Sequence, residues 1–188
     1  MKRFIPICSI FILMFIQAAC RNNDDMLIKD TFYDSPALGF RFNIPDQWRA
    51  IFIEKEDEDD PSDVTIKMTD PDNETTLVFT ARKRGLTPKE AALLDRDRLR
   101  DNKRRNPQVL LSRPWFNQTQ TGYILENTIS KDKQRLFQRR IYISNKPMIY
   151  QFILTAPDKE IADIYNPVLD ALIDSIVLTK MDEQLIEQ

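Results

Sequence analysis

The stretch GFRFNIPDQW, residues 39–48, sets the pattern from which the fold of this 188-residue chain is predicted. From position 40 to Ile44 every second residue is apolar, which is the period of a strand with one buried face. The Pro45-Asp46 pair ends that strand. Aromatic and β-branched residues then predict a second strand from Trp48 to Glu54. The first part of the domain is therefore expected to be built from short consecutive strands.

The same alternation recurs along the rest of the chain and predicts six further strands. The last of them, Met148–Thr155, is apolar on both faces, so it is expected to be a central strand that is covered on both sides. The six predicted strands are Val64–Met68, Leu77–Ala81, Val109–Ser112, Tyr123–Ile129, Leu136–Ile143 and Met148–Thr155.

A helix is predicted between the second and third of these strands. Thr87 and Glu90 have the spacing of a capping box, and Pro88 suits the first helical position. The helix is expected to continue to about Arg105, because Pro107 disfavours helical backbone just before it. Its apolar stripe is narrow and consists of Ala91, Ala92, Leu94 and Leu99.

A second helical segment is predicted from Asp158 to Val177. Pro167 interrupts it, so the segment is either one kinked helix or two short helices. Apolar residues recur in steps of three and four and are expected to face the core. These residues are Ile161, Ile164, Val168, Leu172 and Ile176.

Runs of strands with helices grouped after them indicate an α+β domain. Residues 39–48 resemble the opening motif of PsbP-like domains, and the segments Tyr165–Val168 and Leu172–Ile176 resemble the end of such domains. The resemblance covers about Leu27 to Lys180 and implies an antiparallel β-sheet flanked by helices, an α/β/α sandwich. The matching motifs are packing motifs, so they bear on fold more than on function. Some PsbP proteins are photosystem II subunits, a role that is not carried over, and other members are bacterial lipoproteins of unknown role.

The first twenty residues indicate export. Lys2 and Arg3 precede an apolar run of 13 residues, Phe4–Ile16, which is too short to span a bilayer and fits a signal peptide. Two alanines then precede Cys20, which resembles the lipobox of bacterial lipoproteins, although Gln17 stands where that motif prefers leucine. We therefore predict cleavage before Cys20 and lipidation of its thiol by acyl chains such as palmitate. The alternative is an ordinary secretory signal, which would leave a free thiol.

This interpretation divides the chain into four parts and predicts its location in the cell. The expected parts are a signal peptide (1–19), a lipidated cysteine with a tether (20–26), a PsbP-like domain (27–180) and a polar tail (181–188). The predicted location is the cell envelope, held to a membrane by lipid. In a Gram-negative cell the outer membrane is expected, because Arg21 is not the aspartate that retains lipoproteins at the inner membrane.

Composition argues against several classes of function. The chain has no histidine, which removes the usual general base and the usual zinc ligand. It has three glycines, too few for a glycine-rich phosphate loop. Its net charge of −2 becomes −4 when Lys2 and Arg3 leave with the signal, which argues against nucleic acid as a partner. We therefore expect no catalytic residues, no cofactor and no bound metal.

Two acidic stretches and one basic helix face have more than one interpretation. Glu54–Asp60 and Asp70–Glu74 supply oxygen ligands for calcium, but they lack the spacing of a calcium loop and also suit solvated hairpin tips. The basic helix face suits anionic lipid or an acidic partner, but the interleaved Asp97 and Asp101 also suit pairing on a solvated surface. The basic residues are Arg96, Arg100, Lys103 and Arg104.

Trp115 and Phe116 complete the candidate residues. Two aromatic side chains beside a polar loop suit the anchoring of a protein partner, and they equally suit burial beneath a helix. The sequence thus predicts a non-catalytic, membrane-anchored binding or accessory module for a protein partner. A small-ligand or calcium receptor is the second hypothesis, and a hydrolase that uses carboxylates is the third.

Overall fold

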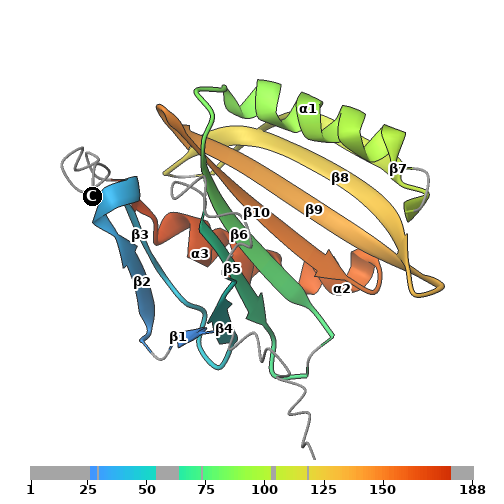
Figure 1. Ribbon diagram of the computed structural model, residues 1–188. Helices are drawn as coiled ribbons and strands as arrows, with labels where there is room; N and C mark the ends of the chain where they lie inside the picture. Colours follow the sequence, from blue (N-terminus) through green and yellow to red (C-terminus); the bar gives the residue numbers. More distant parts are fainter. Residues whose placement is uncertain are drawn as a thin grey trace, which may run out of the picture.

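The computed structural model describes residues 26–28, 30–53, 64–72, 74–102, 105–117 and 119–178. Two antiparallel sheets and three α-helices make an α+β fold, as the sequence predicts (Figure 1). The strands are β1 (Met26–Ile28), β2 (Phe32–Ser35), β3 (Phe40–Asn43), β4 (Arg49–Phe52), β5 (Val64–Thr69), β6 (Thr76–Lys83), β7 (Gln108–Phe116), β8 (Thr121–Lys131), β9 (Gln134–Asn145), β10 (Met148–Ala156) and β11 (Val177–Leu178). The helices are η1 (Pro36–Leu38), α1 (Pro88–Asp101), α2 (Lys159–Ile164) and α3 (Asn166–Asp174).

The larger sheet has eight strands in the order β1-β4-β5-β6-β10-β9-β8-β7. The predicted central position of β10 is confirmed, because β10 pairs with β6 on one side and β9 on the other. Phe152, for example, lies opposite Phe79 of β6 and Ile141 of β9. Its two faces contribute to different cores, Phe152 to the main core and Ile149 to a smaller one on the other face.

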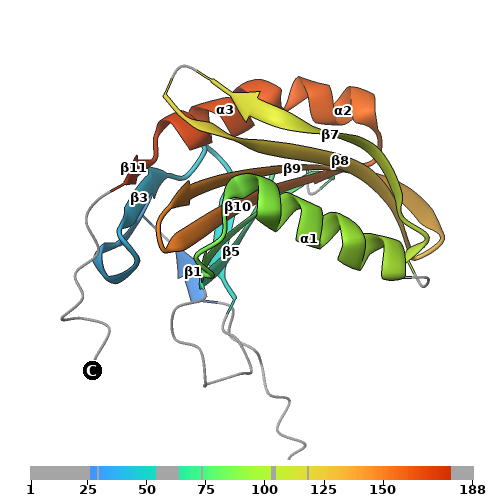
Figure 2. The same ribbon diagram turned by 90° about the horizontal axis from the view of Figure 1, so that it is seen from above.

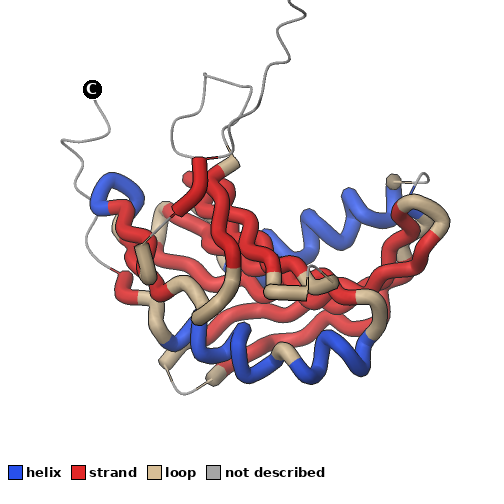
Figure 3. The backbone as a smooth tube through the Cα atoms, turned by 90° about the horizontal axis from the view of Figure 1, so that it is seen from below, coloured by secondary structure: helices blue, strands red, loops and turns tan. Residues whose placement is uncertain are grey.

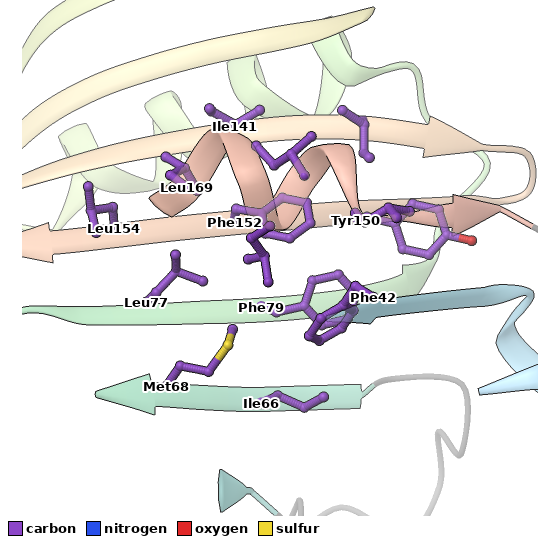
Figure 4. Close-up of a cluster of buried hydrophobic side chains, with 14 of the residues drawn as sticks. Phe42, Ile66, Met68, Leu77, Phe79, Ile141, Tyr150, Phe152, Leu154 and Leu169 are labelled. Atoms are coloured by element: carbon purple, nitrogen blue, oxygen red, sulfur yellow. The ribbon is translucent and has the colours of Figure 1, made fainter. Parts of the chain in front are cut away.

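One face of the large sheet carries the main core. The small sheet, in the order β11-β3-β2, and the helices α2 and α3 supply the other side of this core (Figure 3). Phe79 lies at its centre, with its ring centroid 4.8 Å from that of Phe42 and 5.1 Å from that of Phe152. Figure 4 shows these rings between the strands, together with Met68 and Leu77. The alternation in residues 40–44 thus marks a strand that adds aromatic side chains to this core.

The opposite face of the sheet carries α1 (Figure 2). The predicted capping box is present: the Glu90 amide donates to the Thr87 hydroxyl, and the Thr87 amide donates to the Glu90 carboxylate over 2.8 Å. A second, smaller core forms beneath the helix. It consists of Ala91, Ala92, Leu99, Leu125, Ile129, Tyr142 and Ile149.

Helix lengths and faces differ from expectation at three points. α1 ends at Asp101 rather than Arg105, because the Asn102 amide donates to Leu99 and closes a tighter last turn. Leu94, a member of the predicted apolar stripe, is 44% exposed, whereas Ala91, Ala92 and Leu99 are buried. Of the two alternatives predicted at Pro167, two short helices are observed, and Ile164, which was expected to face the core, is 67% exposed.

Some strands were not anticipated. Strands β1, β2 and β11 were not predicted from the sequence. The strand predicted at Val109–Ser112 is longer than expected, since β7 continues to Phe116. Proline fits this longer strand at position 114 because β7 is an edge strand, where one side of the backbone needs no partner.

Candidate functional site

An apolar groove lies between the β3–β4 connection and α3, two segments more than 100 residues apart in the sequence. Its volume is about 450 Å³. Pro45 and Trp48 form one wall, and Pro167, Val168 and Ala171 form the other. The groove thus presents mainly carbon to the solvent.

The helical wall of the groove is apolar on a face where a surface helix is ordinarily polar. Leu169, Leu172 and Ile173 are buried in the main core. Pro167 and Ala171 nevertheless point outwards and are exposed. The apolar face of α3 that lines the groove is therefore open to solvent.

Trp48 is held in its wall by a chain of contacts that leads into the sheet. Its ring meets that of Tyr165 edge-on, with centroids 5.6 Å apart. The Tyr165 hydroxyl donates to the buried Asp70 carboxylate over 2.7 Å, and this hydrogen bond raises the pKa of Tyr165 to about 12. The other oxygen of Asp70 accepts from the Thr75 amide over 3.0 Å. The tryptophan wall is therefore tied to the β5–β6 turn.

The two walls are also tied to each other. The Asn43 amide donates to the Ser175 hydroxyl oxygen over 2.9 Å, and that hydroxyl in turn donates to the Leu172 carbonyl. Gln47 has a φ of 67°, a left-handed conformation that a residue with a Cβ adopts at a cost. It sits directly before Trp48. The hydrogen bonds through Ser175 therefore fix the β3–β4 connection relative to α3.

Arg139 of β9 links the helices α2 and α3 to the sheet through its side chain. Its guanidinium contacts Glu126 of β8 at 2.6 Å, Asp163 of α2 at 2.9 Å and the side chain of Asn166 of α3. The guanidinium also lies 5.6 Å from the centre of the Phe137 ring. The side chains of Arg139 and Glu126 are only 9% and 8% exposed, so this pair is shielded from water.

Hydrogen bonds from Lys159 and Arg139 lower the pKa of Asp163 to about 2. A carboxylate with a depressed pKa stabilises the fold above its unfolded pKa, near 3.8 here, and this contribution is lost as the pH falls toward 2. The ion pairs of Asp163 with Arg139 and Lys159 are therefore fully formed at neutral pH.

The segment that forms α2 and α3 is rich in carboxylates. Residues 158–174 contain five carboxylates and a single lysine. Asp46 is the only charged residue among the described residues that line the groove itself. An apolar groove with acidic surroundings favours a ligand that is apolar and positively charged.

The groups at this site suit binding rather than bond chemistry. The Ser175 hydroxyl is engaged at both its donor and its acceptor side. The buried carboxylates in the described part of the chain are Asp70 and Glu126, and each already accepts hydrogen bonds. Across the described ranges, no group of three metal-ligating side chains is close enough to hold an ion. None of the helices in those ranges has the length and hydropathy that crossing a bilayer requires.

The predicted partner residues do not form one surface. Arg96 and Arg100 lie in the second half of α1, where Arg96 pairs with Asp97 at 3.0 Å. Phe116 is 75% exposed and lies near the other end of that helix, since Pro114 lines the same cleft as the first residues of α1. Trp115 is half-buried against the main core. Lys103, Arg104 and Cys20 lie outside the described residues.

Only the second of the two acidic stretches considered for calcium contains described residues. The stretch Glu54–Asp60 lies outside the described residues. In the second acidic stretch, Asp70 faces inwards and binds Thr75 and Tyr165 rather than solvent. Its role there is to close the β5–β6 turn.

The groove was not predicted from the sequence because Val168, which lines its helical wall, was assigned to a core-facing stripe. A signal was present: the segment 161–176 carries more apolar residues than one stripe can hold, and Pro167 separates them into two groups. The partner wall at Pro45 and Trp48 has no local signal, because only the folded chain brings it to α3.

The sequence matches no protein-family model and no curated protein sequence. Solved structures are similar in fold. The cyanobacterial PsbP protein CyanoP from Synechocystis sp. PCC 6803 superposes with a TM-score of 0.57 at 13% identity, over 78% of this chain and 91% of CyanoP. LpqN of Mycobacterium tuberculosis, a protein involved in cell envelope biogenesis, gives a TM-score of 0.46 at 15% identity, over 74% of this chain and 83% of LpqN. The likeness to CyanoP shows that the domain has a PsbP-like fold.

Proposed function

We propose that this chain is an exported lipoprotein whose PsbP-like domain, residues 27–180, is a non-catalytic module that holds a protein partner in the groove between Trp48 and α3. The observation that carries the proposal is the apolar wall formed by Pro167, Val168 and Ala171, in which Pro167 and Ala171 are exposed. A lipid on Cys20 and a short tether, residues 20–26, would keep the module at a membrane of the cell envelope.

The chemistry of the groove specifies the partner. Its apolar walls suit the apolar face of a short helix or extended segment. The carboxylates on α2 and α3 and at Asp46 favour lysine or arginine at the edges of that segment. The same carboxylates repel anionic lipid headgroups, so a protein segment fits this surface better than a membrane does. The partner is therefore an apolar segment flanked by basic residues.

Site-specific crosslinking in cells tests the groove. A photoreactive benzophenone amino acid at position 171 is expected to capture a discrete protein partner, because this position is exposed on the groove wall. Mass spectrometry of the adduct should locate the crosslink in an apolar segment that carries lysine or arginine. Reversing the groove charge with Asp46→Lys should reduce the yield of that adduct by roughly tenfold, the effect of a like-charge contact worth about 1.4 kcal/mol.

The matched control places the same amino acid at Asp97, an exposed position on α1 across the sheet. Little or no adduct is expected there. Equal capture from both positions, a crosslink only to lipid, or a captured segment without basic residues would each contradict the proposal.

The anchor is tested separately by the intact mass of the chain extracted from membranes. A fragment that begins at Cys20 and carries acyl mass is expected. A Cys20→Ser variant should lose that mass and appear in the soluble fraction. An unmodified thiol on the wild-type chain would overturn the anchor and leave the groove proposal standing.

A further inference from the structure

A second groove lies on the opposite face of the sheet, where the cover provided by α1 ends. α1 contacts β7, β8 and β9, but the same face continues over β10 and β6. Side chains of β6, β9 and β10 form the floor of the groove, and α1 forms its wall. Thr80 and Gln151 lie in the floor, with Leu94 and Asp95 in the wall. Figure 2 shows this side of the sheet beside α1.

The floor is a closed hydrogen-bond network. The Asp95 carboxylate accepts from the Tyr142 hydroxyl over 2.9 Å and from the Gln151 amide over 2.6 Å. Gln151 also accepts from the Thr80 hydroxyl over 3.3 Å. Burial and the nearby Asp95 carboxylate raise the pKa of Tyr142, so its hydroxyl remains a proton donor at neutral pH. These groups satisfy one another and form a rigid base.

The negative charge of Asp95 is already balanced by two neighbouring arginines. The Arg140 guanidinium lies 3.5 Å from one of its oxygens, and that of Arg98 lies 3.7 Å from the other. Asp95 is the only acidic residue among the described residues that line the groove. No carboxylate of the lining is therefore left to neutralise Arg82 and Arg84.

These two arginines are the feature that points to a ligand. Arg82 lies on β6 and Arg84 follows two residues later, so both side chains fall on the same face of the sheet. Within the described residues neither forms an ion pair, and the Arg82 Nε–H is buried without a hydrogen-bond acceptor. A buried donor without an acceptor costs free energy that a bound acceptor would recover. The acceptor that best suits two guanidinium groups is a carboxylate or a phosphate.

The rest of the lining is apolar. Leu86, Ala91, Leu94 and Ile149 border the groove, and the 44% exposed side chain of Leu94 leaves carbon surface open there. The cavity measures about 50 Å³, room for roughly three or four water molecules, which is the size of one anionic head group. A longer ligand would have to continue along the apolar border towards solvent.

We propose that this groove binds a small amphipathic anion, a carboxylate or phosphate monoester with a short apolar tail. Arg82 and Arg84 hold the head group, and Leu86 and Leu94 cover the tail. We call this site the anion groove, and the groove between Trp48 and α3 the partner groove. The two sites are independent, because α1 and α3 lie on opposite faces of the sheet.

Calorimetric titration of the full chain in phosphatidylcholine nanodiscs tests the site, with empty nanodiscs as the blank. Hexyl phosphate and hexanoate are expected to bind saturably, and neutral hexanol is not. Inorganic phosphate should bind at least about tenfold more weakly than hexyl phosphate, since the burial of two methylene groups of the tail is enough to account for that difference. Equal affinity for the two phosphates would show a site for free anions and contradict the apolar half of the proposal.

Variants separate the two halves of the site. Arg82→Gln is expected to weaken both organic anions at least about tenfold, the effect of losing a hydrogen bond to a charged group. Leu94→Ser should weaken hexyl phosphate but leave inorganic phosphate unchanged. Arg113→Gln is the matched control, because Arg113 is an exposed arginine on the edge strand β7 outside the groove, and it should change nothing.

Thermal melting of each variant shows whether it is folded. The absence of saturable binding below about 1 mM by the folded wild-type chain would overturn the proposal. So would equal losses in Arg82→Gln and Arg113→Gln. If Arg82→Gln fails to fold, the exposed Arg84→Gln provides the same comparison.

Discussion

Replacing Arg139 with methionine is expected to lower the free energy of unfolding by about 3 to 5 kcal/mol. The substitution keeps much of the side-chain volume but leaves the Glu126 carboxylate, 8% exposed, without its cation. It also removes the contacts that hold Asp163 of α2 and Asn166 of α3 to the sheet. Urea denaturation followed by circular dichroism measures the change.

The double variant Arg139→Met/Glu126→Leu is the control for this prediction. A buried ion pair costs desolvation of both charges, so replacing the whole pair by apolar groups is often close to neutral. The double variant should therefore recover most of the stability that Arg139→Met loses. If the double variant is no more stable than the single one, the loss comes from the α2 and α3 contacts and not from the stranded Glu126.

Gly122→Ala is expected to destabilise the domain by about 3 kcal/mol or more, as severe overpacking does. A Cβ at this position would lie 2.1 Å from the Tyr142 carbonyl oxygen, and a backbone atom of a paired strand cannot move aside cheaply. Thermal or urea denaturation gives the size of the effect.

Gly85→Ala is the comparison for Gly122→Ala. Gly85 has a φ of 61°, which alanine adopts at a cost of about 1 to 2 kcal/mol, but a Cβ there meets nothing within 4 Å. We expect Gly85→Ala to be the milder substitution. A loss at position 85 that equals or exceeds the loss at position 122 would contradict the packing argument.

The elements that the sequence predicts well are those whose pattern is local. The alternation of residues 40–44, the capping box at Thr87 and the two-faced strand at Met148–Thr155 each correspond to an observed element. Strand β11 has only two residues, too few for a period to be visible, and β2 has two adjacent aromatic residues followed by two polar ones, which is no alternation. Their place in the fold is set by pairing with β3, which is a tertiary contact.

Both proposed binding grooves were beyond sequence reasoning for a related reason. Leu94 belongs to the apolar stripe of α1 but is exposed at the groove beside that helix, and Val168 has the spacing of a core residue but lines the groove beside Trp48. Arg82 reads as an ordinary polar residue of an alternating strand. Its meaning depends on α1 leaving part of the sheet uncovered, and no local pattern encodes that.

The placement of the two tryptophans gives the domain a built-in optical reporter. Trp48 lines the partner groove, and Trp115 packs against the core on the same side of the sheet. The anion groove is lined by no tryptophan among the described residues. Intrinsic emission should therefore shift when a segment covers Trp48 and stay constant when an anion enters beside α1. Occupancy of one side of the sheet can thus be followed by fluorescence in the unlabelled protein while the other side is titrated.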